Sequence, residues 1–328
     1  MRLLIQISML VLIISACAPE ATKTYTTHQD FGHELNWSSH DTLLAVTTET
    51  GLYIYDTHTF KQVKSFSGFS GSTVVFSKDY LAAINGDGLY VWSLKDYSLL
   101  FQEKTSEDKI RFQSIAISPD GKWLATGEQK QFRLWKLPGV KIATKFPVEG
   151  FVSNLAFTDH NTLIVIEQYK AVIQEWDLRT QKMIRSFEIP RDVLFFTLSA
   201  DGKVMFVDYG ESGVELWNVE TGKAVHYYRG MQGAEDWTRF SGDHQTAIVW
   251  GYAINGGESG MGVWNLKDDQ RIQEFSTPFV NGDGWRAGAL NSNGTVLAAS
   301  NNEGYIYFYN VKGGTKIGEV LLPYKSTG

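Results

Sequence analysis

The chain has 328 residues, of which 43% are hydrophobic and 13% aromatic, enough to bury a sizeable core. Its 36 acidic residues outnumber its 30 basic residues and give a formal net charge of −6, which argues against a nucleic-acid partner. Cys17 is the single cysteine, so an intrachain disulfide, a cysteine-based metal site and a catalytic thiol in the folded body are excluded.

Residues 1–16 have the pattern of a cleaved secretory signal. Arg2 precedes an apolar run from Leu3 to Ile14 that is too short to span a bilayer comfortably. The end of this run, Ile14-Ser15-Ala16-Cys17, resembles the bacterial lipobox. The resemblance implies that Cys17 becomes the lipid-bearing first residue and holds the protein on a membrane of the bacterial cell envelope, with the body outside the cytoplasm. Ordinary secretory cleavage, with Cys17 as a free thiol, is the alternative.

Residues 17–31 are polar and are expected to form a lipidated tether, so residues 32–328 form the folded domain. The segment Thr24–Thr27 could instead pair as an outer strand of the last repeat. The segment Lys316–Val320 has the pattern of the same strand, and we favour it for that place.

The stretch from Ser114 to Phe146 predicts the repeating unit of this domain. It contains four short runs of apolar, β-branched or aromatic residues, each bounded by turn-forming residues, which is typical of an antiparallel meander of four strands. Ser118-Pro119-Asp120-Gly121 is the predicted hairpin between its first two strands. One such meander cannot bury both of its faces, so it needs copies of itself on either side.

Two sequence markers repeat along the chain. The first is an apolar residue followed by a small polar one at the end of the first strand, and its apolar members are Trp37, Phe76, Ile117, Phe157, Leu198, Phe240 and Leu290. The second is an aromatic residue near the end of the third strand, hereafter the marker aromatic: Tyr55, Trp92, Trp135, Trp176, Trp217, Trp264 and Tyr309. The marker aromatics lie 37 to 47 residues apart, which is near the period of propeller blades. The sequence therefore predicts an all-β protein, a seven-bladed β-propeller of four-stranded antiparallel blades.

The repeats resemble the WD-repeat family of β-propellers from Leu35 to about Leu322. The residues that carry the resemblance are Ser118–Gly121, Ser199-Ala200-Asp201-Gly202, Trp176-Asp177, Trp217-Asn218 and the Asp87-Gly88 turn. The Gly-His pair that the family usually places before the first strand is absent at the expected spacing.

Side chains for catalysis or metal binding do not cluster in the sequence. The seven histidines are scattered over separate repeats, and none of them pairs at the spacing of a helical zinc site. We therefore expect no cofactor and no metal, and a non-catalytic scaffold that docks a protein or an extracellular polymer. The alternative is a propeller hydrolase or lyase that acts on an envelope glycan or peptide.

The expected docking surface is the loop face of blades five to seven. In the resembling family, the connections from second to third strand and from fourth to next first strand open on one face. In these blades the connections carry Tyr209, Trp237, Tyr252, Trp285 and Arg286. Aromatic residues and arginine most often dominate binding energy. Alternatively, Trp237 and Trp285 begin their strands and pack inward.

Overall fold

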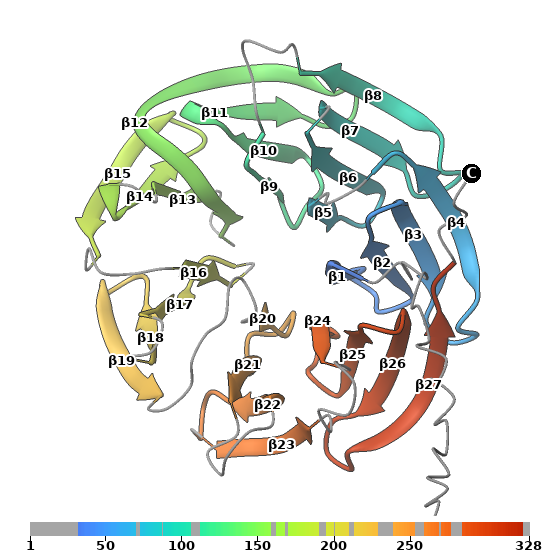
Figure 1. Ribbon diagram of the computed structural model, residues 1–328. Coiled ribbons are helices and arrows are strands. Elements are labelled where there is room, and N and C mark those ends of the chain that lie inside the picture. The colour runs from blue at the N-terminus through green and yellow to red at the C-terminus, as the bar shows by residue number, and fades with distance from the viewer. Residues whose placement is uncertain are drawn as a thin grey trace, which may run out of the picture.

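The computed structural model describes residues 32–69, 73–86, 88–105, 112–158, 162–167, 170–189, 195–199, 201–209, 213–228, 239–252, 259–268, 270–276 and 284–323. In these residues antiparallel strands form five four-stranded sheets and one seven-stranded sheet, arranged around a common centre (Figure 1). The fold is an all-β propeller of antiparallel blades. Cys17 and the segments 1–16 and 17–31 lie outside the described residues.

The strands follow one another from the centre of the ring to its rim. The first two sheets contain β1 (Glu34–Trp37), β2 (Leu43–Thr47), β3 (Gly51–Asp56) and β4 (Gln62–Ser67), then β5 (Thr73–Phe76), β6 (Tyr80–Asn85), β7 (Gly88–Ser93) and β8 (Leu99–Lys104). The large sheet contains β9 (Ser114–Ile117), β10 (Trp123–Gly127), β11 (Gln129–Lys136), β12 (Lys141–Phe157), β13 (Thr162–Glu167), β14 (Val172–Asp177) and β15 (Lys182–Glu188).

The remaining three sheets repeat the four-stranded pattern. Their strands are β16 (Phe195–Leu198), β17 (Val204–Asp208), β18 (Val214–Asn218), β19 (Lys223–Tyr228), β20 (Arg239–Phe240), β21 (Thr246–Tyr252), β22 (Ser259–Asn265), β23 (Gln270–Ser276), β24 (Trp285–Leu290), β25 (Val296–Asn301), β26 (Tyr305–Asn310) and β27 (Thr315–Leu321).

The strand positions predicted from the two markers are confirmed. Each first-strand marker is the last residue of its strand, as Trp37 is of β1 and Leu290 of β24. At every marker aromatic, the register between its strand and the outer neighbour shifts by a β-bulge. A bulge strengthens the local twist and turns the aromatic ring, so the repeated bulge explains why this position carries a large ring in each third strand.

The prediction of separate four-stranded blades throughout the ring needs correction at β12. This strand runs without interruption over 17 residues. Its first part pairs with β11 and its last part with β13, so the two meanders merge into one sheet. Gln131 opposes Pro147 at a register shift, and a bulge is a place where a strand tolerates proline. The backbone N–H of Gly150 donates to Glu167 Oε2 over 2.6 Å, which holds the middle of β12 extended.

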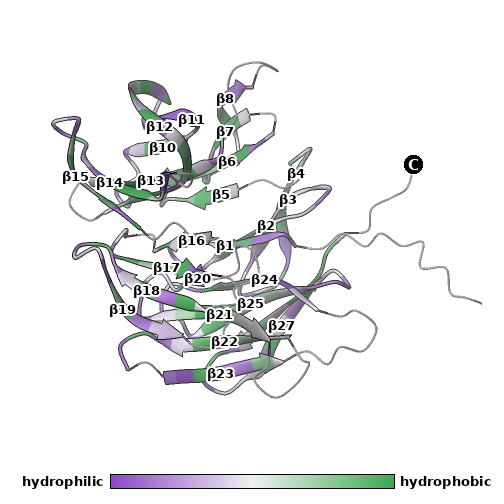
Figure 2. Ribbon diagram, turned by 60° about the vertical axis from the view of Figure 1, so that its left-hand side comes forward, coloured by the Kyte–Doolittle hydropathy of each residue, from purple (hydrophilic) through white to green (hydrophobic). Residues whose placement is uncertain are grey.

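Burial is greatest in the second strands of the sheets and least in the fourth. The second strands are buried on both faces: in β6, Leu81, Ala82 and Ala83 are fully buried. The exposed large hydrophobic residues of the described chain all lie on outer strands, for example Leu99 of β8 and Val225 of β19. The outer strands carry both hydrophilic and hydrophobic residues in Figure 2. The core therefore lies between neighbouring sheets.

The ring closes by side-by-side packing of the first and last sheets (Figure 1). Trp37 Nε1 donates to the carbonyl of Ala289 over 3.1 Å. Leu35 of β1 and Phe308 of β26 share one buried cluster. The favoured segment 316–320 is confirmed as part of β27, the fourth strand of the last sheet, whereas residues 24–27 lie outside the described residues.

Candidate functional site

The turns between first and second strands are built on a recurrent hydrogen-bonded motif. In the hairpin predicted at Ser118–Gly121, the Ser118 hydroxyl donates to Asp120 Oδ1 over 2.7 Å and accepts the N–H of Trp123 over 2.9 Å. The same carboxylate oxygen accepts the N–H of Lys122 over 3.1 Å, and Gly121 takes φ 66°. The hairpins that begin at Ser199 and Ser241 repeat these contacts. They fix the end of the ring opposite the predicted docking face.

The predicted docking residue Tyr209 follows β17 and is half-buried. Its hydroxyl donates to Glu215 Oε2 over 2.7 Å. The indole N–H of Trp217 donates to the same oxygen over 2.7 Å. Tyr209 thus packs against its own sheet and offers only part of its ring to solvent.

Trp285 needs a correction as an exposed contact residue, because its side chain is only 8% exposed. Its indole N–H donates to the carbonyl of Phe275 over 3.0 Å, and its ring meets Tyr307 and Tyr309 edge-on at 6.1 and 6.0 Å. The alternative of inward packing therefore describes Trp285, which joins the last two sheets.

Arg286 is exposed next to this buried tryptophan, and its Nε donates to the side-chain oxygen of Asn302 in the β25–β26 turn. The start of β24 and the β25–β26 turn therefore lie at the same end of the sheet, as the predicted loop face requires. Trp237 lies outside the described residues, and Tyr252 is described only as the backbone end of β21, paired with Ser259. The binding role of all five residues stays a prediction.

A buried charge cluster between β8 and β11 was not anticipated from the sequence. Arg133 is 1% exposed, and its Nε donates to Glu128, which is 2% exposed. Its Nη1 donates to Glu103 Oε1 of the neighbouring sheet over 2.7 Å. The guanidinium lies 5.0 Å from the ring centre of Phe112 and 4.6 Å from that of Trp135. Arg133 Nη2 has no hydrogen-bond acceptor among the described residues.

The position of Arg133, two residues before the marker aromatic, also carries a polar side chain in the next two third strands. Arg133, Gln174 and Glu215 occupy this position in successive third strands. Gln174 Oε1 accepts the indole N–H of Trp176 over 2.9 Å, and Glu215 serves Trp217 in the same way. Glutamine or glutamate at this position thus accepts from the indole of its own strand, whereas the Trp135 indole donates to Thr126.

The same position explains an unsatisfied group in β22. Trp264 follows Gly262, which has no side chain to accept from the indole. Trp264 Nε1 is buried and has no acceptor in the part of the chain that the structure describes. Trp264 therefore lacks the acceptor that Glu215 supplies to Trp217 in the neighbouring sheet.

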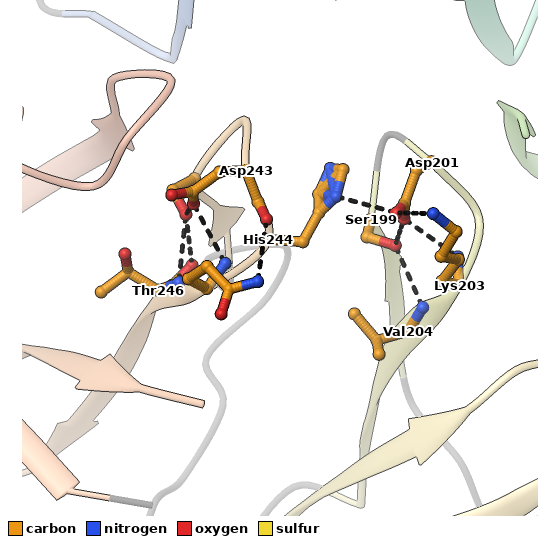
Figure 3. A network of polar contacts seen from close by, with 9 residues as sticks. Ser199, Asp201, Lys203, Val204, Asp243, His244 and Thr246 are labelled. Carbon is orange, nitrogen blue, oxygen red and sulfur yellow. Dashed lines mark hydrogen bonds and ion pairs between the residues drawn. The ribbon is translucent and has the colours of Figure 1, made fainter. Parts of the chain in front are cut away.

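Two hairpins meet in the polar network of Figure 3. His244 Nδ1 lies 3.1 Å from Asp201 Oδ2, and Lys203 Nζ lies 3.3 Å from the same oxygen. Burial raises the pKa of the Asp201 carboxyl, but hydrogen bonds from Ser199 and Lys203 and the attraction of His244 outweigh it and hold that pKa below its usual value. The contact links sheet β16–β19 to sheet β20–β23.

No three His, Cys, Asp or Glu side chains of the described residues are grouped so as to hold a metal ion. The same residues contain no helix with the length and apolarity of a membrane span.

Two yeast proteins are similar to part of this chain. Over 151 residues, or 45% of the chain, it is 28% identical to the Periodic tryptophan protein 2 homolog of Schizosaccharomyces pombe. Over 130 residues, or 38% of the chain, it is 26% identical to Periodic tryptophan protein 2 of Saccharomyces cerevisiae. These relatives are WD-repeat proteins.

The matches cover 18% and 14% of the two yeast proteins, so the chain spans less than a fifth of the length of these curated relatives. No protein-family model matches the chain. The WD-repeat resemblance is thus supported by the relatives and by the propeller fold, while the lipoprotein signal stays a prediction.

Proposed function

We propose that this propeller is a non-catalytic scaffold that docks another protein. The observation that carries the proposal is the similarity to WD-repeat proteins in a chain that folds as a propeller. Such a fold presents loops on a rigid frame, so little conformational entropy is lost when a partner binds.

We propose the loop face at β20–β27 as the docking surface, with Arg286 as its exposed anchor. Trp285 positions Arg286, because its buried side chain fixes the start of β24 against the preceding sheet. Arginine is favoured at binding hot spots, since its planar group can stack and donate several hydrogen bonds.

The docking test compares two exposed arginines at opposite ends of the ring. Arg286→Ala should weaken capture of the partner about 10-fold, or about 1.4 kcal/mol, without changing the thermal midpoint. Arg179, in the β14–β15 turn, has a side chain that is 87% exposed, and Arg179→Ala should leave capture unchanged. If Arg286→Ala and Arg179→Ala captured the partner equally well, Arg286 would not belong to the docking surface.

We further propose that the seven-stranded sheet counts as two blades that share β12, which gives seven blades in all. Two observations support this count. Residues up to Phe151 of β12 pair with β11, whereas residues from Val152 onward pair with β13. A bulged marker aromatic also occurs on each side of the shared strand, at Trp135 and at Trp176.

We also propose that the protein is anchored to a bacterial envelope membrane through Cys17, with the propeller outside the cytoplasm. The support is the lipobox resemblance of Ile14–Cys17 after an apolar run, and more than one acyl chain makes such anchoring durable. In a bacterial host the wild type should partition into detergent, whereas Cys17→Ser should stay unprocessed or partition into water. A cleaved variant that still partitions into detergent would refute the anchor.

A further inference from the structure

The fourth position of the hairpin between first and second strands is glycine in three of the seven repeats. Gly121, Gly202 and Gly294 occupy it with φ 66°, 67° and 69°, a conformation that favours glycine. A Cβ at Gly294 would clash with Thr246 Oγ1, and one at Gly202 would lie 2.8 Å from Ile164 Cγ1. Gly202 and Gly294 therefore permit close approach to the preceding sheet, whereas a Cβ at Gly121 would make only ordinary contact with Ser77.

Asp41 takes this position in the first hairpin, with φ 58°. Its carboxylate accepts the backbone N–H of Ser292 over 2.8 Å, and this bond joins the first sheet to the last. A side chain at the strained position is thus balanced by a polar contact across the seam where the ring closes.

His244 occupies this position in the hairpin between β20 and β21, with φ 57°. Its imidazole meets Asp201 at the 3.1 Å distance described above, and the two side chains are 13% and 16% exposed. By analogy with Asp41, this histidine is placed to bridge a seam, here between sheets β16–β19 and β20–β23 (Figure 3).

Among the described residues, the hairpins that pack against the imidazole contribute the following charged groups. The β16–β17 hairpin contributes Asp201 and Lys203, whose Nζ contacts the same carboxylate. The histidine's own hairpin contributes Asp243, whose Oδ1 already accepts from the Ser241 hydroxyl and the Gln245 N–H. The hairpin between β24 and β25 packs on the other side through the Ser292 carbonyl, and its turn residues 291–295 carry no charge.

The strength of the contact between His244 and Asp201 depends on whether the imidazole is protonated. A histidine in water has a pKa of about 6.5. Protonation of the imidazole adds a positive charge beside the carboxylate, so an ion pair with a hydrogen bond replaces a bond in which only the acceptor is charged. Salt screens a partly buried pair less than an exposed one.

We propose that Asp201 and His244 form a proton-sensitive clasp between these two sheets, tighter at about pH 5.5 than at about pH 8. Because the protonated form holds the seam more strongly, the clasp contributes its full stability below the ordinary histidine pKa. That contribution is lost as the pH rises through the titration range. The inference concerns the end of the ring opposite the docking face and does not depend on the proposed function.

The test measures folding equilibria by urea denaturation of wild type and His244→Asn at both pH values. Asparagine tolerates the positive φ but cannot be protonated. The substitution should reduce the folding constant at least about threefold more at the lower pH. An equal reduction at both pH values would overturn the proposal.

Two further comparisons isolate the pair. His40→Asn changes an exposed histidine in the hairpin of the first sheet. This substitution should change the folding constant by the same factor at both pH values. In an Asp201→Asn background, the pH dependence of the His244→Asn effect should disappear, and its persistence would overturn the proposal. If His244→Asn does not fold, His244→Gly restores the glycine of the sister hairpins and serves in the same comparisons.

Discussion

Replacement of Trp135 by alanine is the sharpest test of the inter-sheet core. The side chain is 1% exposed and belongs to a cluster that joins the second sheet to the large one, with Ala82, Leu89 and Leu124. Its ring centre lies 5.4 Å from that of Phe101, and its indole N–H donates to Thr126 Oγ1 over 3.0 Å.

The expected cost follows from these contacts. Truncation of a buried tryptophan to alanine costs about 3–5 kcal/mol. We expect about 4 kcal/mol here, since the ring also covers the Arg133 guanidinium and the substitution leaves the Thr126 hydroxyl without its donor. Trp135→Phe keeps most of the volume and should lose only about 1–2 kcal/mol. The corresponding Trp217→Ala, at a side chain 9% exposed, should also cost about 3–5 kcal/mol.

Urea denaturation monitored by circular dichroism measures these free energies of unfolding. Leu99→Ala is the control, because this outer-strand residue is 51% exposed and its truncation should stay within about 0.5 kcal/mol. If Trp135→Ala cost less than about 1.5 kcal/mol with an unchanged m-value, the reasoning from inter-sheet packing would be refuted.

Three other substitutions test features of the seams and turns. Arg133→Met should cost about 3–5 kcal/mol by leaving the buried Glu128 carboxylate uncompensated; adding Glu128→Gln should recover part of this loss, and no recovery would contradict the ion-pair explanation. The folded-state pKa of Asp201 is depressed, so its contribution to stability is present above the unfolded pKa, which is about 3.9 for aspartate, and is lost as the pH falls through the folded one. The stability gap between wild type and Asp201→Asn should therefore close as the medium is acidified below the ordinary aspartate pKa, and a constant gap in acid melts would exclude this linkage. Gly294→Ala should lower the thermal midpoint more than Gly139→Ala, since both glycines have positive φ but only Gly294 faces a close neighbour; similar midpoints would show that space is not limiting there.

The strand pattern could be predicted because it depends on local chemistry. Turn residues such as Ser118 and Gly121 act within a few positions of the chain, and the marker aromatics repeat at a regular spacing. The merged sheet could not be predicted in the same way. Pro147 and Gly150 normally indicate a break, and only the pairing with β11 and the bond from Gly150 to Glu167 keep β12 continuous.

The candidate site was less predictable because it depends on contacts between distant segments. Trp285 and Arg286 are adjacent in sequence, yet one is buried by Phe275 and Tyr309 and the other is exposed. An arginine inside an apolar strand also gives no indication of its partners, and Glu103 lies 30 residues from Arg133. The residue types in these loops suggested a binding face. Only the fold shows that Trp285 is buried and that Arg286 is exposed to a partner.

The most direct test of the docking proposal places a photo-crosslinking amino acid at either end of one sheet. Glu303, in the β25–β26 turn, is exposed at the proposed docking face, and Lys312, in the β26–β27 turn, is exposed at the opposite end. After irradiation in cells, the account predicts a specific protein adduct from position 303 that is reduced by Arg286→Ala, and none from position 312. Adducts of equal yield from both positions, or a specific adduct from position 312 alone, would contradict a docking surface on the proposed loop face.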